Sequence, residues 1–256
     1  MNIDKEIGSF LQKEREVFEE RKKLKIPYQR EEMHSKGKKK LDDTETRPRL
    51  LKEEWKEGKK EIKIACHNIN GLKTKGWKVE NLLGWAEDEK IAILGITETN
   101  LTEREGRFLT YAANRKYVGY WTNAAKDKKK GSGVGILIEE QWEKHVGAVR
   151  KISKYIIEIT LYFKQLELVV IGVYIPPNNK TLGKSIQQRI VKTVTRQKRQ
   201  TQVVIMGDFN HTANNILDRQ QPQSANFKRL PIFNWMKKQD FVDTYRDMHP
   251  TSQEYT

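Results

Sequence analysis

Residues 203–210 read Val-Val-Ile-Met-Gly-Asp-Phe-Asn. The four apolar residues predict a buried strand, and Gly207 predicts the turn that ends it. Side chains at positions i and i+2 of an extended segment point to the same side, so Asp208 and Asn210 are expected to converge. In α/β sheets, ligands bind outside the carboxyl ends of the strands. This stretch therefore predicts a polar site at the end of a sheet strand.

Two other apolar segments end in the same way. Residues 61–66 are followed by Asn68 and Asn70, and residues 91–96 are followed by Glu98. Together the three segment ends supply carboxylate and amide oxygens, the ligands that Mg²⁺ prefers in proteins. We therefore expect them to share one cleft that holds a divalent cation, Mg²⁺ or Mn²⁺, and a phosphate group.

Strands and helices alternate from residue 61 onward. Apolar stripes at helical spacing predict helices at Trp77–Glu87, around residues 186–194 and at Leu230–Met236. Two β-hairpins are expected, one from residues 117–121 with 135–138 and one from 155–163 with 166–174. Hairpins mixed with βα units predict mixed sheets rather than a single doubly wound parallel sheet.

Residues 1–60 differ in composition from the rest of the chain. They are rich in Lys, Arg and Glu and contain few β-branched residues. Apolar residues between Ile3 and Leu24 recur at nearly helical spacing, which predicts an amphipathic helix that could pair with a partner helix over residues 3–24. We therefore expect a charged, partly helical extension at residues 1–60 and an α/β domain at residues 61–256.

The chain is strongly basic, with a formal net charge of +15 over 256 residues. The extension holds 18 basic and 14 acidic residues, so most of the excess charge belongs to the α/β domain. Such a charge attracts polyanions, and nucleic acid is the partner that a phosphate site favours, although many basic proteins bind nothing specific. The sequence contains no run of 18 apolar residues, which excludes a membrane span. The single cysteine, Cys66, excludes an internal disulfide framework. An intracellular location fits, and the run Lys38–Lys40 could aid nuclear import.

Short motifs in this order resemble the endonuclease/exonuclease/phosphatase superfamily. They are Asn68-Ile69-Asn70-Gly71, Thr97-Glu98-Thr99, Ser132-Gly133-Val134-Gly135, Tyr174-Ile175-Pro176-Pro177-Asn178, Gly207-Asp208-Phe209-Asn210 and Phe241-Val242-Asp243-Thr244-Tyr245-Arg246. The chain looks most like the apurinic/apyrimidinic-type endonuclease domain of non-LTR retrotransposons. The resemblance implies an α/β four-layer sandwich, in which two mixed sheets face each other and helices lie outside.

The resemblance also implies roles for the residues singled out above. Glu98 would bind the metal ion, and Asn70 would either assist it or serve only as a turn residue. Asn68 would position the metal site, and Asp208 would orient or deprotonate the attacking water. Asn210 would donate a hydrogen bond to the scissile phosphate and stabilise its charge.

Two further donors belong to this expected set. Tyr174 would donate its hydroxyl to a phosphate oxygen, unless it is a buried packing residue. The extra proline in the Tyr-Ile-Pro-Pro segment leaves open whether Asn178 or Asn179 contacts the substrate. Separately, Lys128, Lys129 and Lys130 crowd a loop that either grips a DNA backbone or is simply solvated.

One departure from the family pattern concerns the C-terminus. Family members continue past the point that corresponds to Thr256, with a further aspartate in a Ser-Arg-Ile-Asp-like segment and a terminal Ser-Asp-His. Neither motif occurs in this sequence. The resemblance therefore implies a truncated domain that lacks its last strands, and we expect this chain to be weakly active or inactive.

The leading functional hypothesis is a metal-dependent DNA endonuclease that nicks target DNA for a retroelement. A second hypothesis keeps the fold and changes the substrate, giving a phosphatase for inositol phosphates or sphingomyelin. A third is a non-catalytic remnant that binds nucleic acid. Salt-dependent DNA binding without cleavage would favour the third, and release of inorganic phosphate would favour the second.

Overall fold

The computed structural model describes residues 62–72, 76–113, 116–124, 131–164, 166–219 and 229–253. All of these residues belong to one compact unit, Gly58–Thr256. The helix predicted at residues 3–24 and the lysines at positions 128–130 lie outside the described residues. The domain division at residue 61 therefore stays a prediction.

The first sheet contains four strands in the order β1-β2-β4-β3. They are β1 (Lys63–Asn68), β2 (Ile91–Thr97), β4 (Val134–Glu139) and β3 (Tyr117–Trp121). Strand β1 pairs parallel with β2, and β4 pairs antiparallel with both β2 and β3. All seven residues of β2 are buried, because this strand has a neighbour on each side and is covered on both faces.

The second sheet has the order β5-β6-β7-β8. Its strands are β5 (Val146–Ser153), β6 (Ile156–Tyr162), β7 (Glu167–Tyr174) and β8 (Gln202–Asp208). The pairs β5–β6 and β6–β7 are antiparallel, whereas β7–β8 is parallel and connected through a helix. Both sheets are therefore mixed, as the hairpins predicted.

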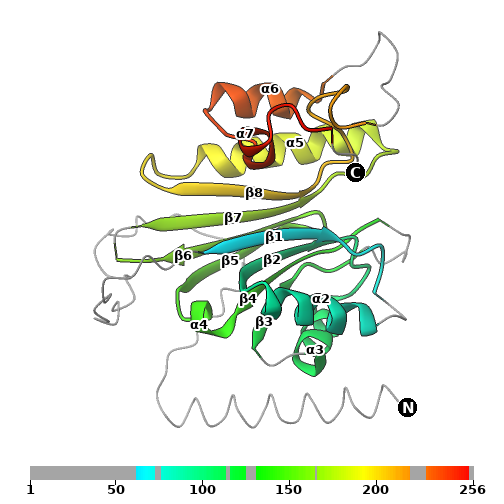
Figure 1. The fold of residues 1–256 in the computed structure, drawn as a ribbon, viewed down its shortest axis with the longest axis vertical. Helices are drawn as coiled ribbons and strands as arrows, with labels where there is room; N and C mark the ends of the chain where they lie inside the picture. The colour runs from blue at the N-terminus through cyan, green and yellow to red at the C-terminus, as the bar shows by residue number, and fades with distance from the viewer. Residues whose placement is uncertain are drawn as a thin grey trace, which may run out of the picture. The chain divides into compact units, whose positions relative to one another are not determined.

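The two sheets face each other, and helices lie on their outer sides (Figure 1). Helices α2 (Trp77–Asp88) and α3 (Glu103–Ala113) cover the first sheet, and α5 (Lys180–Thr195) and α6 (Pro231–Lys238) cover the second. Two shorter helices, α4 (Glu140–Glu143) and α7 (Thr244–Met248), complete the described elements. Buried side chains of both sheets, such as Ile93, Ile136 and Val170, form the core between them. The expected four-layer α/β sandwich is confirmed.

Strand β8 differs from its prediction as a buried strand. Val203, Val204 and Ile205 are only half-buried, and Met206 alone is fully buried. The reason is its position, since β8 forms the edge of the second sheet. An apolar sequence does not distinguish an edge strand from a central one.

Helix α3 was not predicted from the sequence. The residues that it buries are Gly106 and Thr110, which carry little hydrophobic signal. A side chain at Gly106 would lie 2.4 Å from the ring of Trp121, so the helix packs closely on β3 because this residue is a glycine. The inward face, Gly106, Leu109, Thr110 and Ala113, does follow helical spacing, but Leu109 is its only large apolar residue, so the pattern is weak in the sequence.

Candidate functional site

Three strand ends bring the predicted polar residues together. Asn68 is the last residue of β1, Glu98 follows β2 directly, and Asp208 is the last residue of β8. The Asn68 amide Nδ2 donates to Glu98 Oε1 at 3.0 Å and to Asp208 Oδ2 at 2.7 Å. One side-chain amide thus connects a carboxylate from the first sheet with a carboxylate from the second.

The loops that present these groups have an unusual backbone. Asn70, Glu98, Asn100 and Asn210 all have positive φ, between 47° and 55°. Such conformations cost roughly 1–3 kcal/mol each in non-glycine residues and persist only where the surroundings enforce them. Here, backbone hydrogen bonds extend the β1–β2 pairing beyond the strands, including one from Gly71 N to Glu98 O at 2.8 Å. The loops are therefore held in place before any ligand binds.

Asn70 and Asn210 are not part of the extended segments on which their prediction was based. Both residues lie just past a strand end with positive φ, so the period of two no longer applies. The Asn70 backbone N–H donates to Asn68 Oδ1 at 3.0 Å, and the Asn210 backbone N–H donates to Asp208 Oδ1 at 2.7 Å. Each turn thereby fixes the orientation of the Asn68 or Asp208 side chain through a backbone hydrogen bond.

Tyr174 lies at the end of β7 and is 3% exposed. Burial, followed by a hydrogen bond to Glu98 and the charges of Glu98 and Asp208, raises the pKa of its hydroxyl group. The Asn210 side chain also contacts this hydroxyl group and donates to Ile175 O at 3.0 Å. Tyr174 therefore stays protonated at neutral pH and can donate a hydrogen bond to an anion.

Lys78, in the first turn of α2, is a site residue that the sequence did not reveal. Its ammonium group donates to the carbonyl oxygen of Ile69 at 2.7 Å and to those of Asn70 and Gly71 at 3.4 Å each. Three carbonyl groups of the loop after Asn68 thus converge on one cation. A lysine on a helix usually indicates a solvated face, so its sequence position gave no signal of this role.

Asn100 is a second residue that sequence reasoning missed. Its backbone N–H donates to Ser132 O at 2.9 Å, and its Oδ1 accepts from Ser132 N at 3.2 Å. These bonds tie the Glu98 loop to the segment that leads into β4. In that segment Gly131 has a φ of 86°, and a side chain there would lie 3.1 Å from the Tyr174 hydroxyl oxygen. Because residue 131 is a glycine, this segment can lie close to the Tyr174 hydroxyl group.

The two candidate substrate-binding asparagines after β7 have different environments. Asn179 is the N-cap of α5, and its Oδ1 accepts from Leu182 N at 2.9 Å. Asn178 is exposed and has no hydrogen-bond partner among the described residues. Capping therefore occupies Asn179, whereas Asn178 remains the better candidate for a substrate contact.

The donor set fits a divalent cation. Glu98 and Asp208 approach each other through the Asn68 amide, and among the described residues neither forms an ion pair with a basic side chain. The described part of the chain holds no group of three His, Cys, Asp or Glu residues that could bind a metal on their own. Mg²⁺ does not require one, because it binds through one or two carboxylates and retains several waters.

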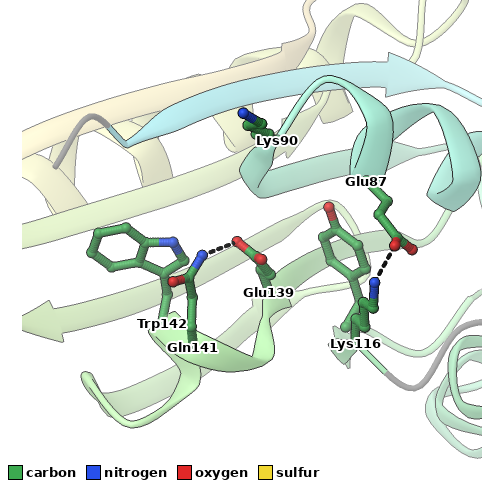
Figure 2. Close-up of a pocket in the computed structure, with 7 residues that line it drawn as sticks. Glu87, Lys90, Lys116, Glu139, Gln141 and Trp142 are labelled. Atoms are coloured by element: carbon green, nitrogen blue, oxygen red, sulfur yellow. Dashed lines mark hydrogen bonds and ion pairs between the residues drawn. The ribbon is translucent and has the colours of Figure 1, made fainter.

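A separate pocket of about 410 Å³ lies at the opposite end of β2, near Lys90 (Figure 2). Its charged groups engage one another, since Lys116 forms an ion pair with Glu87 and the Gln141 amide donates to Glu139 at 2.7 Å. With these carboxylates already engaged, and with Glu98 at the far end of the strand, this pocket is not part of the candidate site.

No protein-family profile matches the chain. None of the helices in the described parts combines the length and the apolarity of a membrane span.

Solved structures with the same fold include the following two. The catalytic domain of APE2 from Xenopus laevis is 20% identical, with a TM-score of 0.54 over 75% of this chain and 74% of its own. The AP endonuclease LMAP from Leishmania major is 14% identical, with a TM-score of 0.52 over 75% of this chain and 71% of its own.

A third similar structure is the endonuclease domain of TRAS1, a telomere-specific non-LTR retrotransposon. It is 14% identical, with a TM-score of 0.47 over 64% of this chain. The match spans 66% of the TRAS1 domain, slightly less than two thirds of its length. From the sheet topology and the first two structures above, this chain has the endonuclease/exonuclease/phosphatase fold.

Proposed function

We propose that this protein is a metal-dependent phosphodiester hydrolase that cleaves nucleic acid. The observation that carries the proposal is the Asn68 amide, which holds Glu98 and Asp208 together at the carboxyl ends of strands from both sheets. Two adjacent carboxylates without a basic partner are what a bound divalent cation would neutralise. An AP endonuclease that shares the fold supports a phosphodiester as the substrate.

Glu98 would hold the cation, with the amide oxygen of Asn70 as a second ligand. A Mg²⁺ ion bound there would neutralise phosphate charge and polarise the scissile group. The strained backbone at Glu98, fixed by hydrogen bonds on both sides, would keep its carboxylate from relaxing when the ion is absent.

Asp208 would act on the attacking water. Both of its carboxylate oxygens are fixed, Oδ1 by the Asn210 backbone N–H and Oδ2 by the Asn68 amide. A carboxylate held in this way accepts a hydrogen bond from water in a defined direction and can take its proton. The water oxygen then bonds to phosphorus as the bond from phosphorus to the leaving oxygen breaks.

Tyr174 and Asn210 would stabilise the charge that develops on the phosphate. The Tyr174 hydroxyl group, which is bonded to Glu98, is protonated at neutral pH and would donate to the phosphate instead. Asn210 places an amide beside the same hydroxyl group, so two neutral donors would face one phosphate oxygen. Removing one such donor typically costs roughly 10²–10³-fold in rate.

A plasmid-nicking assay tests this function. Supercoiled plasmid incubated with the full chain and Mg²⁺ should convert to the open-circular form, and the conversion should disappear with EDTA. It should also disappear in Asp208→Asn, which keeps the size of the side chain but removes its charge. Asp88→Asn, at the exposed end of α2, is the matched control and should nick like the wild type.

Conversion that persists in Asp208→Asn would refute the assignment of this site. Binding of DNA without any cleavage would favour the non-catalytic alternative, and release of phosphate from inositol phosphates would favour the phosphatase. A low wild-type rate would leave the test valid, because the test compares Asp208→Asn with the wild type under the same conditions.

We further propose that the substrate is DNA and that the protein serves a non-LTR retroelement. The motif series from Asn68 to Arg246 supports this narrower assignment. A reverse-transcriptase reading frame in the same transcript would bear it out, and a transcript without one would count against it. The nuclear location that this role requires stays a prediction.

A further inference from the structure

The two outer helix layers carry opposite charge. On the first sheet, α2 and α3 together contain three basic and five acidic residues. On the second sheet, α5 and α6 contain six basic residues and no acidic residue. Because the helices occupy the outer sides of the sandwich (Figure 1), the helix layer on the second sheet is basic and the one on the first sheet is acidic.

The basic side chains of α5 point away from the sheet. Gly183, Ile186, Ile190 and Thr193 form its buried face. Its basic residues, Lys180, Lys184, Arg189 and Lys192, are all exposed. Among the described residues none of these four forms an ion pair, whereas Arg196, just past the helix, pairs with the buried Glu158.

Helix stability accounts for Lys192, which lies in the last turn of α5, but not for Lys180. Lys180 lies in the first turn, where the helix dipole disfavours cations and favours acidic residues. The first turn of α5 contains no acidic residue. A cation at this end costs typically 0.3–1 kcal/mol, so Lys180 acts against the stability of the helix.

We propose that the outer face of α5 binds the phosphate backbone of nucleic acid. The choice of this polyanion rests on the proposed nuclease function. The face begins near the candidate site, because α5 follows Tyr174 by a short loop whose Ile175 carbonyl is bonded by Asn210. Sixteen residues of α-helix extend about 24 Å, enough to contact several consecutive phosphates of a substrate flank.

The test compares two charge reversals of equal size in the full chain. Lys184→Glu with Lys192→Glu alters the α5 face, and Arg104→Glu with Lys164→Glu alters exposed residues elsewhere. Binding to a fluorescent 30-base-pair duplex is measured in EDTA over a range of salt concentrations, so that cleavage plays no part. Thermal unfolding of all proteins confirms that the variants are folded.

The α5 variant should bind the duplex at least tenfold more weakly at low salt. The slope of log K against log salt should fall by about two, because each lost phosphate contact removes about 0.9 from it. The control should weaken binding by less than threefold through its long-range charge alone. Equal loss of duplex affinity in both variants would overturn the proposal. So would a loss in the α5 variant that appears with vesicles of anionic lipid and not with the duplex.

The same binding assay separates this inference from the nuclease function. If α5 reversal leaves duplex affinity unchanged while Mg²⁺-dependent nicking persists, the surface proposal fails and the catalytic one stands. If nicking is absent but α5 reversal abolishes duplex binding, the catalytic proposal fails and the surface proposal stands.

Discussion

The Lys78 ammonium group binds the carbonyl oxygens of the loop that carries Asn70. It donates to three consecutive carbonyl groups, and the loop in turn fixes Asn68 through the Asn70 backbone N–H. Without the Lys78 ammonium group, three carbonyl dipoles would face one another, and fewer contacts would stabilise the positive φ of Asn70. Lys78 therefore acts as a positioning residue for the amide that joins the two carboxylates.

Lys78→Met keeps the length of the side chain and removes its charge. We expect affinity for Mn²⁺ to fall roughly 10–100-fold, the loss typical when a group that orients a metal ligand is removed. Lys63→Met is the control, because Lys63 donates to a single carbonyl, that of Glu89, at 3.2 Å near the opposite end of β1. Methylammonium should partly restore Mn²⁺ binding to Lys78→Ala, and a loss equal to that of the control would exclude the positioning role.

At this scale the sequence predicted identities better than orientations. Asn68, Glu98 and Asp208 could be selected because each follows an apolar segment. The positive φ of Asn70 and Asn210 could not be predicted, since such a conformation after a strand depends on hydrogen bonds from neighbouring loops. The contact of Lys78 with the loop depends on how α2 packs, which no local pattern reports.

Helix α5 is anchored to the second sheet by a buried ion pair at its C-terminal end. The Glu158 side chain, on β6, is 2% exposed and pairs with Arg196, while Arg150 lies 3.8 Å away. Gln197 Nε2 also donates to Glu158, at 3.4 Å. Leaving the buried Glu158 carboxylate without its main partner would destabilise the fold, so this contact fixes the C-terminal end of α5.

Arg196→Ala should destabilise the domain by about 2–3 kcal/mol, below the 3–5 kcal/mol typical of fully buried pairs because Arg196 is partly exposed. Lys198→Ala removes a neighbouring pair with Glu167, in which the lysine side chain is 81% exposed, and should cost under about 1 kcal/mol. Urea unfolding of both variants measures the difference. Equal free energies of unfolding would contradict the anchoring role.

Elements with a regular apolar pattern were the ones the sequence predicted. Both hairpins, β2, α2, α5 and α6 appear close to their expected ranges. The strand β5 was missed because its residues are exposed or half-buried and include charged side chains. The status of β8 as an edge strand depends on sheet order, which is a property of the whole fold.

At the scale of the whole molecule, several buried tyrosines couple stability to alkaline pH. Burial, followed by Glu139 and Glu87, raises the pKa of Tyr117 to about 12. Its hydroxyl group donates to Ile91 O at 2.8 Å and is lost as a donor on ionisation. In the unfolded chain a tyrosine ionises near pH 10, so between about pH 10 and 12 the folded state binds more protons than the unfolded state.

The free energy of unfolding should therefore fall as the pH rises through this window. For Tyr117 alone the loss is on the order of 2 kcal/mol. Urea unfolding between pH 8 and 11.5 measures it, and Tyr117→Phe should show a shallower decline because it cannot ionise. Identical slopes for the two proteins would contradict this assignment.

The central claim is that Glu98 and Asp208 form one cation site joined by Asn68. Titration of Mn²⁺ into the full chain, followed by the electron paramagnetic resonance signal of the free ion, tests it without relying on activity. We expect Glu98→Gln to weaken Mn²⁺ binding at least tenfold, whereas Glu80→Gln, exposed on α2, should bind like the wild type. Equal Mn²⁺ affinity in all three proteins would contradict it.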